Sequence, residues 1–381
     1  MRLRLAALAA CVVFPAYAQE APIQLPRTIG VTAYDVGSGG YNQAVAVGNA
    51  LKHHLNVNLR ILPGRNDVAR QAPVRDHRVP LSFHGVGTYF SQEGVFEFAA
   101  RDWGPQPVRL LLMNKSDQIL TIATARDAGV RTMKDLRGKR VAWVAGAPAL
   151  NANVTAVMAA VGLTWNDVQR VQFGGYGQAM QGMINGQVDA GWASSISGPL
   201  FQLEASPRGL HYPALPHSDT EAWKRLRENA PWFIPGTGTT GAGLSPQNPV
   251  ENTAYPYPIL MAYADADEDL VYNFTRAMLA YFRDYAEAAP GNKGWALERQ
   301  RFDWAVPYHP AAVRALREAG AWKPEHDAHN QALIRRQEVL AEAWRAYLPN
   351  APQDAAAFAE GWMNARAEAL RAAKLPVVFE N

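Results

Sequence analysis

The stretch Thr28–Leu62 reads TIGVTAYDVGSGGYNQAVAVGNALKHHLNVNLRIL, and it decides the fold. A β-rich run at 28–33 leads to a glycine-rich turn at 37–40, and a second β-rich run follows at 57–62. Between them, residues 41–55 carry an apolar stripe at helical spacing, made of Ala44, Val47, Leu51 and Leu55. Strand, helix and strand in this order predict a right-handed crossover within a parallel sheet.

The same alternation continues along most of the chain. Further strands are predicted in a first unit at 79–83 and 108–113, and a second unit of strands and helices begins near 119. We therefore expect an α/β protein of two lobes, with lobe two inserted into lobe one. The predicted parts are a signal peptide at 1–18, lobe one at 19–115 and 230–325, lobe two at 116–229, and a helical C-terminal extension at 326–381.

Two later segments depart from the simple alternation. Residues 231–258 are dense in Gly, Pro, Thr and Asn, and they predict a long irregular return to the first lobe. Residues 268–289 predict one long helix, and the tail predicts two amphipathic helices near 328–347 and 354–373.

The N-terminus has the anatomy of a secretory signal peptide. A basic head at 1–4 precedes an apolar run at 5–14 and the small-x-small cleavage signal Ala16-Tyr17-Ala18. A periplasmic location follows from this interpretation. The alternative is a lipoprotein box, Leu8-Ala9-Ala10-Cys11, with lipid attached to Cys11. It is less favoured because only about six apolar residues would precede the cut.

Composition narrows the classes of function. Cys11 is the only cysteine, so a chain without its leader has no disulfide. The formal charge is +3, and loss of Arg2 and Arg4 leaves +1, which gives no electrostatic support for a nucleic-acid partner. No stretch beyond the leader is long and apolar enough to predict a membrane span. No metal or cofactor site is predicted.

Glycine-rich turns supply the first candidates for a site. A helix start exposes backbone N–H groups and carries about half a positive charge, so it can bind an anion without a basic side chain. Three turns have this character, at 37–41, 146–151 and 174–176, and the alternative is that their glycines serve tight turns only. His84 directly follows the third strand, where ligands of open α/β sheets bind, and it either donates to a carboxylate or caps the strand.

Enzyme motifs are absent from the sequence. It contains no H-E-x-x-H, G-x-S-x-G or S-x-x-K pattern, and without its leader it has no thiol nucleophile. Gly37-Ser38-Gly39-Gly40-Tyr41-Asn42 lacks the third glycine of a dinucleotide-binding turn. The prediction is therefore a binding protein and not an enzyme.

Several motifs, in order along the chain, resemble the TAXI family of solute-binding subunits of TRAP transporters. The resemblance covers about 28–322, and its pieces are Gly37-Ser38-Gly39-Gly40-Tyr41, Met133–Val141, Ala159-Ala160-Val161-Gly162-Leu163, Gly186-Gln187-Val188-Asp189-Ala190 and His309-Pro310-Ala311-Ala312. It implies a two-lobed periplasmic-binding-protein fold of type II-like topology that closes on a small organic carboxylate. It also implies TRAP membrane subunits as the partner, with no bond made or broken.

The resemblance and the strand-end rule together give the candidate ligand-binding residues. They are Ser38, Gly39, Gly40, Tyr41, His84, Pro148, Asn151, Tyr176, Ser194 and Ser195. The second-lobe loop departs from the family's G-x-P-G-S-G-T, because only Asn151 stays polar in Gly146-Ala147-Pro148-Ala149-Leu150-Asn151. We therefore expect a pocket less hydrophilic than that of a glutamate binder. A ligand-binding partner of a sensor kinase, or a periplasmic enzyme on the same scaffold, is the alternative function.

Overall fold

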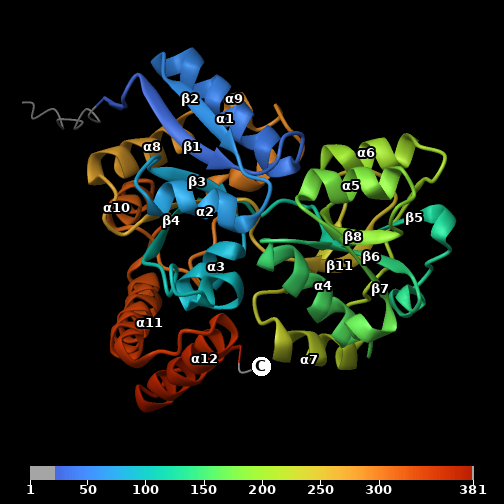
Figure 1. Cartoon of the computed structure of the whole chain (residues 1–381). Helices are drawn as coiled ribbons and strands as arrows, with labels where there is room; N and C mark the ends of the chain where they lie inside the picture. Colours follow the sequence, from blue (N-terminus) through green and yellow to red (C-terminus); the bar gives the residue numbers. More distant parts are fainter. Residues whose placement is uncertain (1–21, 380–381) are drawn as a thin grey trace, which may run out of the picture.

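The chain forms two α/β lobes that lie side by side, with a pair of helices below the first lobe (Figure 1). This computed structural model describes residues 22–379, so the expected signal peptide and the alternative Cys11 box lie outside the described residues. The architecture confirms the predicted class, with two sheets, two crossings between them and a C-terminal helical extension.

The first lobe is built on a five-stranded sheet in the order β2-β1-β3-β12-β4. Its strands are β1 (Thr28–Ala33), β2 (Asn58–Pro63), β3 (Leu81–His84), β4 (Val108–Met113) and β12 (Ile259–Tyr263). As predicted, β1 is parallel to β2 and to β3, whereas β12 returns from the second lobe and is antiparallel to both its neighbours. The helices of this lobe are α1 (Gly39–Leu55), α2 (Asp67–Arg75), α3 (Gly87–Glu93), α8 (Glu268–Ala280), α9 (Phe282–Tyr285) and α10 (Pro310–Glu318).

Local sequence explains how α1 begins and ends. The side chain of Ser38 accepts a hydrogen bond from the amide of Tyr41, which satisfies one of the free N–H groups of the first turn. Asn56 closes the helix in the left-handed conformation that asparagine tolerates. The stripe expected from the sequence faces the core, since Ala44, Val47 and Leu51 are all buried.

The second lobe is built on another five-stranded sheet, in the order β7-β6-β8-β5-β9. Its strands are β5 (Leu120–Ala125), β6 (Arg140–Val144), β7 (Gln169–Phe173), β8 (Ala190–Ser194) and β9 (Leu210–His211). The helices are α4 (Pro148–Ala160), α5 (Tyr176–Ile184), α6 (Gly198–Ala205) and α7 (Thr220–Asn229). The strand that enters from the first lobe, β5, is antiparallel to β8.

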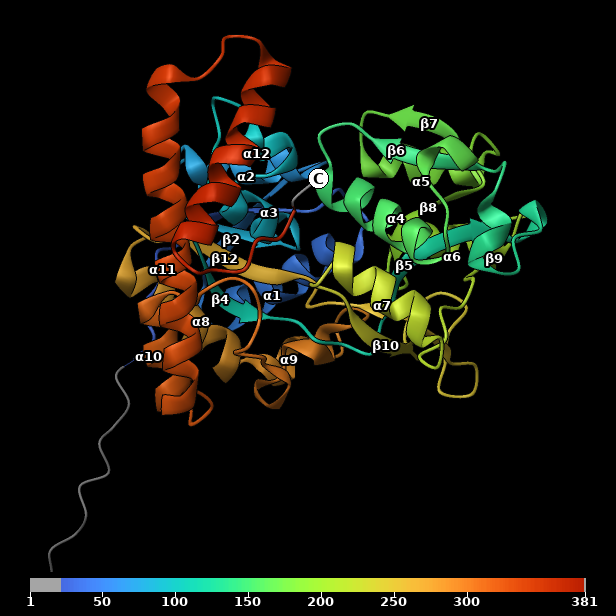
Figure 2. The ribbon, with the colours of Figure 1, turned by 90° about the horizontal axis from the view of Figure 1, so that it is seen from below.

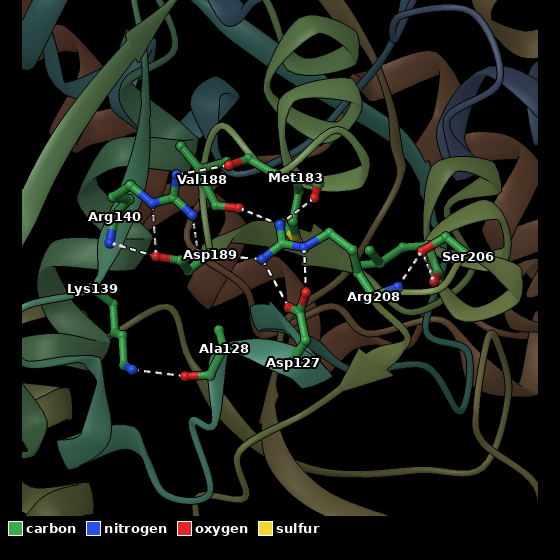
Figure 3. A network of polar contacts seen from close by, with 11 residues as sticks. Asp127, Ala128, Lys139, Arg140, Met183, Val188, Asp189, Ser206 and Arg208 are labelled. Atoms are coloured by element: carbon green, nitrogen blue, oxygen red, sulfur yellow. Dashed lines mark hydrogen bonds and ion pairs between the residues drawn. The ribbon is translucent and has the colours of Figure 1, made fainter.

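Asp189, part of a motif singled out in the sequence, has a structural role at the far end of this sheet (Figure 3). Its carboxylate pairs with Arg140 at 2.6 Å and with Arg208 at 3.3 Å, and Arg208 also pairs with Asp127 at 2.8 Å. Burial opposes ionisation of Asp189, but the hydrogen bonds and charge of Arg140 outweigh it and lower the pKa of the carboxyl. Because Asp189 precedes β8, this network lies away from the carboxyl ends of the strands.

Two predictions about secondary structure were wrong. The stretch expected to be irregular forms an antiparallel ribbon of β10 (Ile234–Gly238) and β11 (Val250–Ala254), and the side chain of Thr253 donates to the carbonyl of Leu120 in β5. The expected long helix at 268–289 divides at Tyr281 into α8 and α9. The carbonyl of Met278 there accepts from the hydroxyl of Tyr285 at 2.9 Å, which takes the place of a helical partner.

The C-terminal helices α11 (Pro324–Tyr347) and α12 (Ala355–Ala372) pack side by side against the first lobe (Figure 2). Their anchor is Glu93 of α3, a fully buried carboxylate that pairs with Arg336 at 2.7 Å and also with Arg366. The indole N–H of Trp362 adds a 2.6 Å hydrogen bond to the carbonyl of Gly94. Among residues 22–379, no helix is both long and apolar enough to cross a membrane.

Candidate functional site

A cavity of about 510 Å³, its open mouth included, lies between the lobes. The cavity lies at the carboxyl ends of the strands, where open α/β sheets bind ligands. Both lobes and the crossing before β12 line it, with Tyr34, Ser38, Arg65, Asn66, Asp67, Arg70, Val86, Leu120, Ala147, Ala149, Leu150, Tyr176, Trp192, Ala193, Ser194, Tyr255 and Tyr257.

The lobes are closed on each other, because side chains of lobe one bond to the helix starts of lobe two. The carboxylate of Asp67 accepts from the amide of Ala149 in α4 at 2.8 Å. The carboxylate of Asp35 accepts from the amide of Gly177 in α5 at 3.0 Å. Asn66 donates to the carbonyl of Ala145 at 3.1 Å. The expectation that the turns of lobe two offer free amides to a ligand is therefore corrected for this closed form.

The charge of Asp67 is compensated inside the protein. Arg70 forms a buried ion pair with it, and the guanidinium carbon of Arg70 lies 3.9 Å from the ring centre of Tyr34. Burial raises the pKa of Asp67, while the charge of Arg70 opposes that rise. The pair thus presents little net charge to a ligand.

Arg65 is the guanidinium of the lining that is available to an anion. Its side chain is exposed and makes no hydrogen bond or ion pair with another residue of the described part of the chain. It lies against Gly175, where an added Cβ would come within 3.0 Å of the Cβ of Arg65. A bound anion at the cavity mouth would therefore meet an unpaired positive charge.

Five of the seventeen residues that line the cavity are aromatic. The rings of Tyr34 and Tyr257 meet edge to face with centroids 4.9 Å apart, and Trp192 and Tyr255 are both more than nine-tenths buried. The hydroxyl of Tyr176 lies 2.7 Å from that of Ser197, and burial raises the pKa of Tyr176 to about 12. Such walls suit a ligand with an apolar or aromatic body.

Of the side chains proposed from sequence, those of Ser38, Tyr176 and Ser194 line the cavity. Gly39 and Gly40 lie behind the wall and allow α1 to approach it closely. A Cβ on Gly40 would overlap the ring of Tyr34, and one on Gly39 would lie 2.7 Å from Ile196.

The other five proposed residues are outside the cavity lining. Asn151 donates to the carbonyl of Val144 at 2.8 Å, and Ser195 donates to that of Thr240 at 2.7 Å. Tyr41 is half-buried against the core, and Pro148 occupies the first turn of α4.

His84 is the fifth of these residues. It is fully buried in β3, and its Nδ1 accepts from the amide of Gly85 at 2.9 Å. Burial lowers the pKa of His84 well below its ordinary value, so the ring is neutral. In this structure His84 agrees with the strand-capping alternative, and it does not donate a hydrogen bond into the cavity.

Two groups of lining residues that were not predicted from the sequence follow β2 and precede β12. Arg65, Asp67 and Arg70 come after the Pro63-Gly64 stop, at the carboxyl end of a parallel strand, so the strand-end rule would have found them. Tyr255 and Tyr257 lie in the crossing segment, for which the sequence has no periodic signal. No group of three or more His, Cys, Asp or Glu suited to a metal occurs among the described residues.

The model of the NMT1-like family matches residues 88–320. No curated protein matches the chain. Among solved structures, the alkanesulfonate-binding protein SsuA from Xanthomonas axonopodis pv. citri bound to MOPS is 15% identical, with 92% of this chain and 95% of that chain covered and a TM-score of 0.43.

Two further solved structures are similar at the same level. A protein of Bordetella bronchiseptica RB50 is 16% identical, with 82% of this chain and 97% of that chain covered and a TM-score of 0.45. A mutant of ArgBP from T. maritima is 14% identical, with 69% and 92% covered and a TM-score of 0.41.

Proposed function

Since this chain belongs to the NMT1-like family, we propose that it is an extracytoplasmic solute-binding protein that captures a small organic carboxylate between its lobes. The observation that carries the proposal is the cavity itself. Both lobes contribute to its lining, five aromatic side chains form part of its wall, and Arg65 is unpaired at its mouth. The ligand would place its apolar body against Tyr176 and Trp192 and its charge toward Arg65.

Closure of the lobes is the work that the protein does in this proposal. A ligand that contacts both lobes binds the closed form better than the open form, and it shifts the population toward closure by that difference in affinity. The closed protein would then deliver its cargo to the membrane subunits of a transporter, and the TAXI resemblance favours subunits of the TRAP type. No bond is made or broken in this cycle.

A thermal-shift screen of organic acids tests the ligand class. Aromatic and branched aliphatic carboxylates are expected to raise the melting temperature more than glutamate does, because most of the lining residues are aromatic or aliphatic. Binding to the folded state stabilises it by RT ln(1 + [L]/Kd), so a ligand at a hundred times its Kd adds about 2.7 kcal/mol. A larger shift with glutamate than with every hydrophobic acid would refute the proposed class.

A further inference from the structure

Two tyrosine hydroxyls of the cavity wall are available as hydrogen-bond donors. Tyr255 and Tyr257 are 6% and 7% exposed, and both line the cavity. The hydroxyl of Tyr255 lies 3.0 Å from Nδ2 of Asn153. The other end of that amide, Oδ1, accepts from the indole N–H of Trp232 at 2.9 Å. An indole nitrogen can only donate, so Asn153 must present its NH₂ group to Tyr255.

The oxygen of Tyr255 thus accepts from Asn153, and its own proton needs an acceptor. Neither hydroxyl donates to another residue of the described chain, so each has a proton free for a group in the cavity.

Both hydroxyls are protonated at neutral pH. Burial raises the pKa of Tyr255 and of Tyr257 well above the ordinary value for tyrosine. The two side chains therefore act as donors and not as phenolate acceptors.

The carboxylate and the amide oxygen of the lining are already engaged within the protein. Asp67 is the carboxylate of the lining, and it accepts from Arg70 and from the amide of Ala149. The amide oxygen of Asn66 accepts from the backbone of Ala69 at 2.8 Å. A ligand ammonium group placed here would lose its water, share these engaged acceptors and lie beside two guanidinium groups, Arg65 and Arg70, and a poorly paired buried charge is costly.

We propose that Tyr255 and Tyr257 donate hydrogen bonds to acceptor oxygens of the ligand and thereby select organic acids without an amino group over the corresponding amino acids. This inference rests on the proposed function, and it narrows the ligand class. A polar site of this kind rejects a mismatched analogue because the mismatch leaves buried groups unpaired.

Matched ligand pairs test the selection. Isothermal titration of the protein compares 3-phenylpropanoate with L-phenylalanine and 4-methylpentanoate with L-leucine, each pair differing only by the α-ammonium group. The acids are expected to bind at least roughly tenfold more tightly than the amino acids. Equal or tighter binding of the amino acids would overturn the inference and leave a solute-binding function standing. If no organic anion of a broad panel bound, the proposed function would fail, and this inference with it.

Two variants test the named side chains. Tyr255→Phe and Tyr257→Phe each remove one donor and are expected to weaken the tightest acid by roughly tenfold. Tyr285→Phe is the matched control, because its buried hydroxyl donates to Met278 outside the cavity. Wild-type affinity in both folded cavity variants would overturn the assignment. Because Tyr255→Phe also leaves an N–H group of Asn153 unpaired, Tyr257→Phe and the ligand pairs test the proposal if that variant does not fold.

Discussion

Two aspartates of the first lobe occupy the positions where a bound anion was expected. Asp67 and Asp35 accept from amides in the first turns of α4 and α5, so the protein supplies its own negative charges to both helix starts. The ligand anion is left with Arg65 at the mouth and the hydroxyls of the wall. The closed form therefore suits a ligand with one anionic group better than a ligand with two anionic groups.

Arg65→Gln tests the role of that guanidinium. The substitution removes the unpaired positive charge of the lining, and we expect the affinity for an organic acid to fall roughly tenfold, as for loss of a hydrogen bond to a charged group. The loss should shrink as salt is added, because Arg65 is exposed and screened. Titrations at low and high salt measure it. Arg60→Gln on β2, outside the lining, is the control, and equal affinities in both variants would contradict the role.

Gly40→Ala tests the close approach of α1 to the cavity. The added methyl group would overlap the ring of Tyr34 and push it into the cavity, and such overpacking costs typically 1–3 kcal/mol. We expect weaker ligand binding, by roughly tenfold, together with a lower melting temperature. Gly48→Ala lies on the same helix, where the new Cβ would lie 3.2 Å from Leu59, away from the cavity. Unchanged affinity in Gly40→Ala would remove this turn from the site.

The helices and strands that depend on local apolar periodicity could be predicted from the sequence. The strands and helices of both α/β units follow from apolar spacing, as with β1 and α1. The β10–β11 ribbon was missed because it depends on packing against β5, more than a hundred residues away in the sequence. The contact of Asp67 with Ala149 joins residues 82 positions apart in different lobes, and no local pattern records such a pair.

The junction between α3 and the C-terminal helices gives a prediction about pH. Burial opposes ionisation of Glu93, but Arg336 and Arg366 together outweigh it and hold the pKa of the carboxyl below its ordinary value of 4.5. The ion pairs therefore stabilise the fold fully above pH 4.5, and the stabilisation is lost as the pH falls through the lower pKa of the folded state. Tryptophan fluorescence against pH should report the loss, because Trp362 bonds to Gly94 at this junction.

Glu93→Gln is the variant that isolates this effect. It leaves two buried arginines without a counter-ion, so a loss of about 3–5 kcal/mol in the free energy of unfolding is expected at neutral pH. Its stability should no longer show the acid step of the wild type. Glu338→Gln removes an exposed pair with Arg335 and is expected to cost at most about 1 kcal/mol. A variant at Glu93 as stable as this control would contradict the anchor.

On the scale of the whole molecule, the C-terminal segment links the two lobes. In both views the last described residues run from α12 toward the second lobe (Figures 1 and 2). The ring of Phe379 stacks on Trp232 with centroids 5.7 Å apart, and it also meets Phe90 of α3 at 5.6 Å. Trp232 is bonded to Asn153 of α4, so Phe379 is connected to the second lobe through Trp232. The helical extension, whose role could not be predicted from the sequence, thus reaches the face where the lobes close.

Phe379→Ala should therefore shift the molecule toward an open form. Loss of one aromatic pair costs about 0.5–1.5 kcal/mol beyond area burial, which changes the open–closed equilibrium roughly two- to twelvefold. We expect a larger radius of gyration by small-angle X-ray scattering without ligand, and an affinity for organic acids lower by a similar factor. Phe201→Ala, an exposed phenylalanine on α6, should change neither quantity. Wild-type scattering and affinity in Phe379→Ala would show that lobe closure does not depend on the C-terminal segment. The cause of closure would then be the cavity contacts and the bonds of Asp35 and Asp67 to the helix starts of the second lobe.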